Sequence, residues 1–144
     1  MKMKNNIKRV LAIVGIALFF INCSKYPEGP SLSLKSKKNR ITNFWEYEKH
    51  FDEDGRESTD PRYQIISYEI KKDGTVIYKD GGDFPSSEEG TWSFTNNKEN
   101  ILMDFGNLAY PDLKNAFNFK IIKLKSKELW IKDWNDHIIH YVPK

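Results

Sequence analysis

From residue 41 to the end of the chain, apolar residues recur mostly at every second position, and short polar clusters interrupt the alternation. Successive side chains of a β-strand point to opposite faces of the sheet, so this spacing predicts strands with one buried face. Asp73-Gly74, Asn96-Asn97 and Asn135-Asp136 lie between the alternating segments, and these residue types tolerate the backbone of tight turns. The pattern therefore predicts short antiparallel strands joined by hairpins.

The expected strands follow one another closely along the chain. They are residues 41–51, residues 63–71, and segments around Val76 and Tyr78, Trp92 and Phe94, Ile101 and Met103, Phe117 and Phe119, Leu129 and Ile131, and residues 138–142. About eight strands suit a closed up-and-down β-barrel better than an open sheet, since closure removes exposed edges. About 100 residues are enough for one small domain, so we expect a single all-β barrel.

A different apolar segment, residues 10–21, stands near the start of the chain behind four basic side chains. It is shorter than the roughly 20 residues of a membrane-spanning helix, and the basic-then-apolar order is typical of a secretory signal. Cys23, the only cysteine, follows it, and residues 20–23 resemble the lipobox of bacterial lipoproteins, in which the cysteine receives fatty acyl chains such as palmitate. The alternative is a general secretory signal with an incidental cysteine. We predict a signal peptide over residues 1–22 and a lipid anchor at Cys23.

Removal of residues 1–22 changes the charge of the protein. The remaining chain has 19 basic and 20 acidic side chains, so the net charge of +3 belongs to the precursor and gives no support for nucleic-acid binding. Residues 23–40 contain Pro27, Gly29 and Pro30 followed by basic residues, which is typical of a flexible tether. We therefore expect a tether over residues 23–40 and the domain over residues 41–144. The protein would be anchored in the cell envelope at the outer membrane, and the sequence leaves its periplasmic or surface exposure open.

Several segments of the mature chain resemble the lipocalin-like lipoproteins of Bacteroidetes-type bacteria. They are residues 23–30, residues 32–41, Trp45, residues 72–75, residues 90–94 and residues 124–130. The resemblance covers nearly all of the mature chain. It implies a lipocalin-like barrel, and the family name implies a calyx for a small apolar ligand.

Aromatic residues are abundant in the expected strands. Because aromatic side chains are favoured in strands and fill small barrels, most of them are explained as core. An eight-stranded barrel can also leave room for one small ligand, and some of the rings would then line a pocket at one end. The candidate ligand-binding residues, chosen from the strand faces expected to point inward, are Tyr68, Tyr78, Trp92, Phe119 and Tyr141.

The sequence contains no pattern typical of catalysis or metal binding. His137 and His140 are three residues apart, which on a strand directs them to opposite faces and prevents them from sharing a metal ion. The acidic residues around Gly55 lack the spacing of a calcium-binding loop. His50 is isolated, and no nucleophile with a matched base is visible. We expect no catalytic residue, no metal and no cofactor, and we do not expect an enzyme.

Two functions remain open at this point. The first is a lipid-anchored barrel that binds a small hydrophobic ligand. The second is a structural or interaction lipoprotein with a filled barrel, whose loops at residues 51–62, 81–89 and 106–115 contact another envelope protein.

Overall fold

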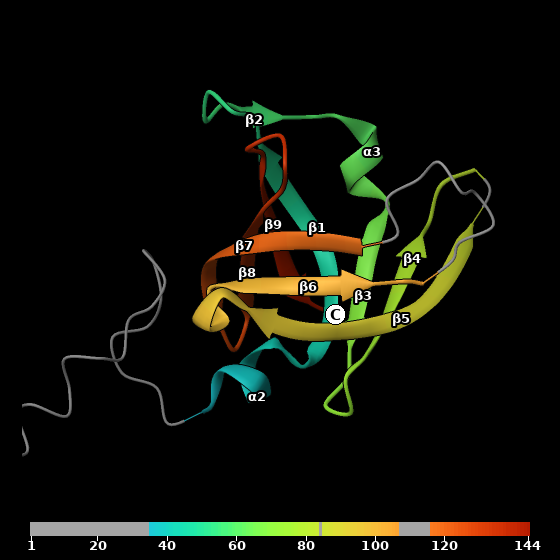
Figure 1. Cartoon of the computed structure of the whole chain (residues 1–144). Helices are drawn as coiled ribbons and strands as arrows, with labels where there is room; N and C mark the ends of the chain where they lie inside the picture. Colours follow the sequence, from blue (N-terminus) through green and yellow to red (C-terminus); the bar gives the residue numbers. More distant parts are fainter. Residues whose placement is uncertain (1–34, 84, 107–115) are drawn as a thin grey trace, which may run out of the picture.

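The computed structural model describes residues 35–83, 85–106 and 116–144 (Figure 1). The predicted signal peptide, Cys23 and most of the predicted tether lie outside these ranges, as does most of the loop at residues 106–115. No helix in the described ranges is long and apolar enough to cross a membrane.

The described residues form short helices and nine strands. The helical segments are α2 (Lys37–Ile41), α3 (Pro61–Gln64) and the 3-10 turn η1 (Asn96–Lys98). The strands are β1 (Asn43–Phe51), β2 (Glu57–Ser58), β3 (Ile66–Ile70), β4 (Thr75–Asp80), β5 (Ser86–Thr95), β6 (Asn100–Asp104), β7 (Ala116–Lys125), β8 (Glu128–Lys132) and β9 (Ile138–Pro143).

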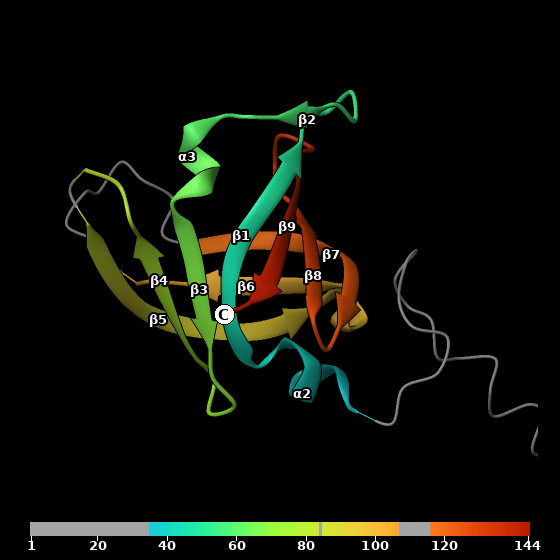
Figure 2. The same ribbon diagram turned by 180° about the vertical axis from the view of Figure 1, so that it is seen from behind.

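These strands close into an antiparallel barrel. The order is β2-β1-β3-β4-β5-β6-β7-β8-β9, and β1 also pairs with β9. The two-residue strand β2 pairs only with the end of β1, so eight strands form the barrel wall and β2 extends one edge (Figures 1 and 2). The prediction of an all-β barrel with about eight strands is confirmed.

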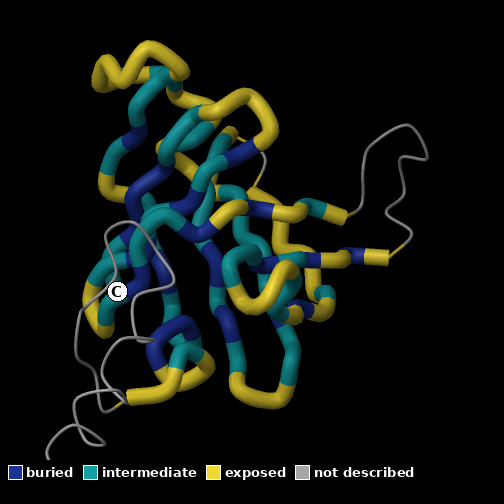
Figure 3. Tube along the Cα trace, turned by 60° about the vertical axis from the view of Figure 1, so that its left-hand side comes forward, coloured by how far each residue is buried: buried dark blue, intermediate teal, exposed yellow. Residues whose placement is uncertain are grey.

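The inward faces of all eight barrel strands supply the core, and most buried residues recur with the predicted period of two. The core consists of Ile41, Trp45, Tyr68, Ile70, Val76, Trp92, Ile101, Met103, Phe105, Phe119, Ile121, Leu124, Leu129, Ile131, Ile139 and Tyr141. Exposed residues lie mainly in the turns and at the start of β5 (Figure 3). The period breaks in β7, where Ile121 and Leu124 are both buried, because an irregularity between Ile121 and Lys123 shifts the register.

Two strand boundaries differ from the sequence prediction. The second long strand begins at Ile66, not at Tyr63, because Asp60 caps a helical turn that starts at Pro61 and delays the strand. The first strand begins at Asn43, because Ile41 is the last residue of α2 and not part of the strand. The predicted turns agree with the structure at residues 71–74 and 133–137, and Gly74 adopts the positive φ of +100° that its turn requires.

The barrel has two distinct ends, because antiparallel strands bring alternate connections together. One, which we call the α2 end, carries α2 and the turns at residues 71–74, 96–99 and 125–128. The other, the α3 end, carries α3, the connection around residues 81–85 and the turn at residues 133–137. At the α2 end Ile41 is fully buried, and its carbonyl oxygen accepts a hydrogen bond of 2.7 Å from Trp45 Nε1. This bond ties α2 to the barrel core.

Candidate functional site

A chain of aromatic rings occupies the part of the barrel interior nearest the α3 end. Tyr68 lies at its centre, with ring-centroid distances of 5.9 Å to Tyr78, 5.6 Å to Tyr141 and 6.5 Å to Phe119. The contacts continue through Phe105, Phe117 and Trp134. We call this set the aromatic cluster: Tyr68, Tyr78, Phe105, Phe117, Phe119, Trp134 and Tyr141.

The cluster runs from the buried core to the surface. Tyr68, Phe119 and Tyr141 are buried, whereas Trp134 in the β8–β9 turn is 65% exposed. The Trp134 ring stacks on Phe117 at a centroid distance of 5.7 Å. A large exposed aromatic ring held against other rings offers an apolar and polarisable surface at the barrel end.

The three tyrosines of the cluster bring polar groups into these apolar surroundings. Burial raises the pKa of Tyr68 and Tyr141 far above the usual value. Burial, together with the nearby carboxylate of Asp80, raises the pKa of Tyr78 to about 12. The Tyr78 hydroxyl donates to Asp80 Oδ2 over 3.4 Å. All three hydroxyls therefore stay neutral near pH 7.

Four of the five candidate residues meet in this cluster, namely Tyr68, Tyr78, Phe119 and Tyr141. Trp92 does not: its Nε1 donates to the carbonyl oxygen of Lys71 over 2.7 Å, in a turn of the α2 end, and its ring packs edge-on against Phe94. Trp92 points toward the core as expected, since it is only 7% exposed. Its position along the barrel axis, however, separates it from the other four candidate residues. Whether any of the five binds a ligand stays a prediction.

The sequence prediction omitted three members of the cluster: Phe105, Phe117 and Trp134. Phe117 precedes Phe119 by two residues and shares its strand face, so the alternation could have identified it. Trp134 lies in a turn, where alternation gives no information.

A polar network joins α3 to the β8–β9 turn beside the cluster. The Tyr63 hydroxyl donates to Asp133 Oδ2 over 2.8 Å and lies 2.7 Å from His137 Nδ1. Burial and the hydrogen bond to Asp133 raise the pKa of Tyr63 to about 12. On its far side, His137 Nε2 lies 3.1 Å from Glu53 Oε2. These contacts fix α3 and the β1–β2 connection over the end of the barrel.

His50 is fully buried beneath this network. Its ring centroid lies 4.3 Å from that of Tyr63, and its Nδ1 lies 3.1 Å from the Tyr47 hydroxyl. Burial, and to a lesser degree repulsion from His137, lowers the pKa of His50, so the ring is neutral near pH 7. The sequence could not show this packing, because Tyr63 and His137 are distant from His50 in the chain.

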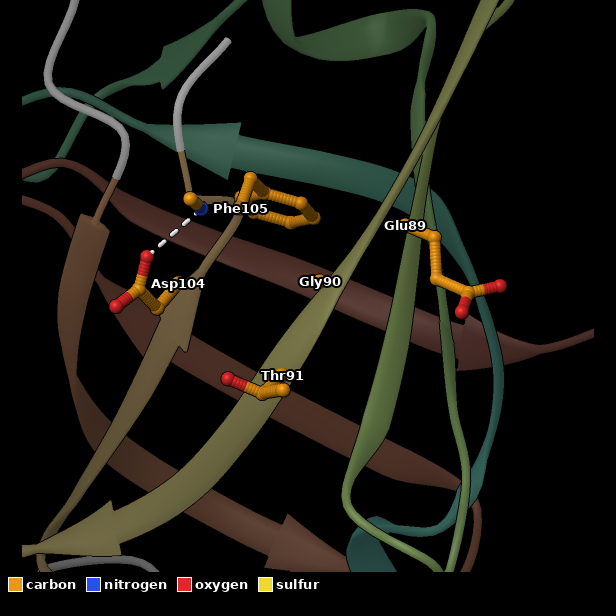
Figure 4. A pocket seen from close by; sticks show the side chains of 6 residues that line it. Glu89, Gly90, Thr91, Asp104 and Phe105 are labelled. Carbon is orange, nitrogen blue, oxygen red and sulfur yellow. Dashed lines mark hydrogen bonds between the residues drawn. The ribbon is translucent and has the colours of Figure 1, made fainter.

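An open hollow of about 320 Å³ lies in the wall next to Phe105. Its lining residues are Glu89, Gly90, Thr91, Asp104, Phe105 and Gly106 (Figure 4). The recorded pairing of β5 with β6 ends at Thr91 and Asp104, which both line the hollow. Asp104 Oδ1 accepts a hydrogen bond of 2.9 Å from the Gly106 amide, which holds the end of β6. The hollow thus combines one ring of the aromatic cluster with the carboxylates of Glu89 and Asp104.

Metal binding finds no support in the ranges that the structure describes. Within them, no group of three or more His, Cys, Asp or Glu side chains converges closely enough to hold an ion. His137 belongs to the polar network, whereas His140 lies on the outer wall.

His140 forms part of a stack on that outer wall. Its ring lies parallel to Trp130 at a centroid distance of 3.7 Å, and Lys123 Nζ lies 3.7 Å from the centre of the Trp130 ring. His140 is buried, and its Nδ1 has no hydrogen-bond partner. Burial, together with repulsion from Lys49 and Lys123, lowers its pKa to about 4.

The low pKa of His140 predicts a pH-dependent stability. The folded state keeps the ring neutral down to a pH of about 4, whereas the unfolded chain takes up the proton at about pH 6.5. The contribution of His140 to stability is therefore complete above about pH 6.5 and is lost as the pH falls toward about 4. Urea unfolding should show a larger loss of stability over this range for the wild type than for His140→Phe, which keeps the stack. Equal losses in the two proteins would contradict the assignment.

The comparisons with known proteins support the fold. No protein-family model matches the sequence, and the search of curated proteins found no match. Among solved structures, a lipocalin-like protein from Bacteroides uniformis superposes with a TM-score of 0.56 at 14% identity, covering 73% of this chain and 99% of that one. An uncharacterized protein from Bacteroides eggerthii gives a TM-score of 0.54 at 11% identity, covering 72% of this chain and 98% of that one. The barrel is therefore lipocalin-like in its fold.

Proposed function

We propose that this protein is a lipid-anchored protein of the cell envelope whose barrel binds a small, largely apolar ligand at the α3 end. The observation that carries the proposal is the aromatic cluster, which extends without interruption from the buried Tyr68 to the exposed Trp134. Binding sites for small molecules are mostly apolar, with a few polar groups that orient the ligand. The proposal includes no catalytic step.

The chemistry of the cluster defines the kind of ligand. The rings of Phe105, Phe117 and Trp134 supply flat apolar surface, and the Tyr78 hydroxyl supplies a neutral polar group beside Asp80. The hollow next to Phe105 borders the cluster, and in this proposal the ligand approaches through it from the side of the barrel. A ligand with an apolar or aromatic body and one hydrogen-bonding group matches this arrangement.

A second candidate function is contact with another envelope protein. Ile65 and Trp134 are 37% and 65% exposed, and both lie at the α3 end. Exposed large hydrophobic residues that gather on one face are typical of interaction sites. In this alternative the barrel is a filled scaffold, and Trp134 is part of a protein contact.

Tryptophan fluorescence can test the ligand proposal, because Trp134 is the one tryptophan at the α3 end. Trp45 and Trp92 are buried toward the α2 end, and Trp130 lies on the outer wall. Titration with fatty acids, retinoids and porphyrins should quench emission saturably for at least one compound class. Trp134→Phe should abolish most of the quenching, whereas Trp130→Phe should retain it.

Isothermal titration calorimetry with a compound that quenches the fluorescence measures its affinity without relying on any tryptophan. Tyr78→Ala should weaken the affinity by about tenfold, since it removes both a ring contact and a hydroxyl. Absence of any response across the panel, together with capture of an envelope protein that depends on Trp134, would reject ligand binding in favour of the second function.

The anchor has a separate test. Cys23→Ala should leave the protein as unprocessed precursor or as a soluble product, because the substitution removes the only thiol available for acylation. Fractionation of cells, with mass spectrometry of the N-terminus, measures the outcome. A variant that is still cleaved at the same bond and still membrane-bound would contradict the lipid anchor.

A further inference from the structure

The two ends of the barrel carry opposite charge. At the α2 end, residues 35–42, 71–74, 96–99, 125–128 and 143–144 contain ten basic and three acidic side chains, a formal charge of +7. At the α3 end, residues 52–65, 80–83, 85–89, 104–106 and 133–137 contain two basic and twelve acidic side chains, a formal charge of −10. The near-neutral total thus conceals a strong dipole along the barrel axis.

Several basic groups of the α2 end are available to a partner. Lys38, Lys72 and Lys127 are exposed, and within the described residues none of them is in an ion pair. They come from α2 and from two different hairpin turns, so they spread over the whole end and not along one strand. Lys71 and Lys125 lie beside them, each with one acidic neighbour.

The tether joins the barrel at this same basic end. α2 begins at Lys37 and leads directly into β1, so the described chain enters the barrel from the α2 side (Figure 1). The 13 residues between Cys23 and α2 span at most about 45 Å when fully extended. That length by itself permits either end of the barrel to approach the membrane, so charge decides which end does.

We propose that the α2 end is a docking face for anionic lipid headgroups, which turns the acidic α3 end and its aromatic cluster away from the membrane. This proposal rests on the proposed function, because the lipid anchor is what brings the barrel to the membrane. Each basic side chain near an anionic bilayer strengthens the association about fivefold. The opposite end is repelled by the same surface, so both charges favour one orientation. A lipid surface is favoured over other polyanions because the anchored tether, at most about 45 Å long, keeps the whole barrel near the bilayer.

Lysine labelling of an anchored chain tests this orientation. The chain from residue 23 to residue 144 is coupled through Cys23, its sole thiol, to a maleimide phospholipid in vesicles, which supplies an anchor whatever happens in the cell. The vesicles are phosphatidylcholine alone or with about 30 mol % phosphatidylglycerol, and mass spectrometry follows acetylation of each lysine. On the anionic vesicles Lys38, Lys72 and Lys127 should react at least about threefold more slowly than on the neutral ones. Lys49 and Lys132, which lie toward the α3 ends of β1 and β8, should react equally on both.

Salt and charge variants complete the test. About 0.5 M NaCl should remove the protection, because it shortens the screening length to a few ångströms. In the variant Lys38→Glu, Lys72→Glu, Lys127→Glu, the neighbouring Lys71 and Lys125 should no longer be protected on anionic vesicles. They should stay protected in the matched variant Lys49→Glu, Arg56→Glu, Lys132→Glu, whose three changes lie toward the α3 end. Equal labelling on the two kinds of vesicle would overturn the proposal. Protection by soluble nucleic acid but not by vesicles would also overturn it and assign the face to another polyanion. Neither result bears on lipidation, which the Cys23→Ala variant tests separately.

Discussion

Trp45→Ala is expected to lower the free energy of unfolding by about 3 to 5 kcal/mol, the range for removal of a large buried aromatic side chain. Trp45 is fully buried in β1, and its indole nitrogen donates to the Ile41 carbonyl oxygen over 2.7 Å. The substitution therefore leaves a cavity and also an unpaired buried carbonyl. Because that bond ties α2 to the core, α2 should detach before the barrel unfolds.

Urea denaturation followed by far-ultraviolet circular dichroism measures this loss, and hydrogen exchange of the α2 amides reports the detachment. Trp134→Ala is the matched control, because the same residue type is 65% exposed there and its removal should cost less than about 1 kcal/mol. Trp45→Phe fills part of the cavity but cannot donate the hydrogen bond, so it should lie between the two. A Trp45→Ala midpoint close to that of the Trp134→Ala variant would show that the α2 end does not depend on this side chain.

Gly90→Ala should destabilise the barrel by about 2 to 3 kcal/mol, the upper part of the range for overpacking. A Cβ at this position would lie 2.8 Å from Phe105 Cδ1 and closer still to the carbonyl oxygen of Asp104. Because the nearer obstacle is backbone, β5 and β6 must move apart for the methyl group to fit. The same movement would displace Phe105, which contacts Tyr78 at a centroid distance of 6.1 Å.

Thermal and urea unfolding measure the effect, and Gly81→Ala is its control. At Gly81 a Cβ would meet the Ile65 carbonyl oxygen at 3.5 Å, an ordinary contact, so that variant should stay within about 1 kcal/mol of the wild type. Similar stabilities for the two alanine variants would mean that β5 and β6 adjust freely at Gly90. If Gly90→Ala folds, it should also weaken any ligand that responds to Tyr78→Ala.

The fold could be predicted from the sequence because its information is local. Period-two alternation reports which strand face is buried, and it placed Tyr68, Tyr78, Phe119 and Tyr141 on the inner face. The Asp73-Gly74 and Asn135-Asp136 turns were equally visible, since each depends on residues adjacent in the chain. The eight-stranded barrel follows from these segments and turns.

Alternation could not, however, place a residue along the barrel axis. Trp92 has the same inward facing as Tyr78, but it lies near the opposite end, because the position of a residue along its strand decides which rings it meets. The sequence also assigned Ile41 and Tyr63 to strands, although both belong to short helices. A capped helical turn can hold an apolar residue that alternation alone assigns to a strand.

The sequence by itself determined the all-β class, the main turns, the inward faces and the prediction of a lipid anchor, since each depends on neighbours in the chain. Only the tertiary structure decided that Tyr63 meets Asp133 and His137, that Trp134 completes the aromatic cluster, and that basic and acidic turns separate to opposite ends. These features depend on strand register and barrel closure, which bring together distant residues such as Tyr63 and His137, 74 positions apart. No local pattern encodes such contacts, because the physical link between the residues exists only once β1 pairs with β9.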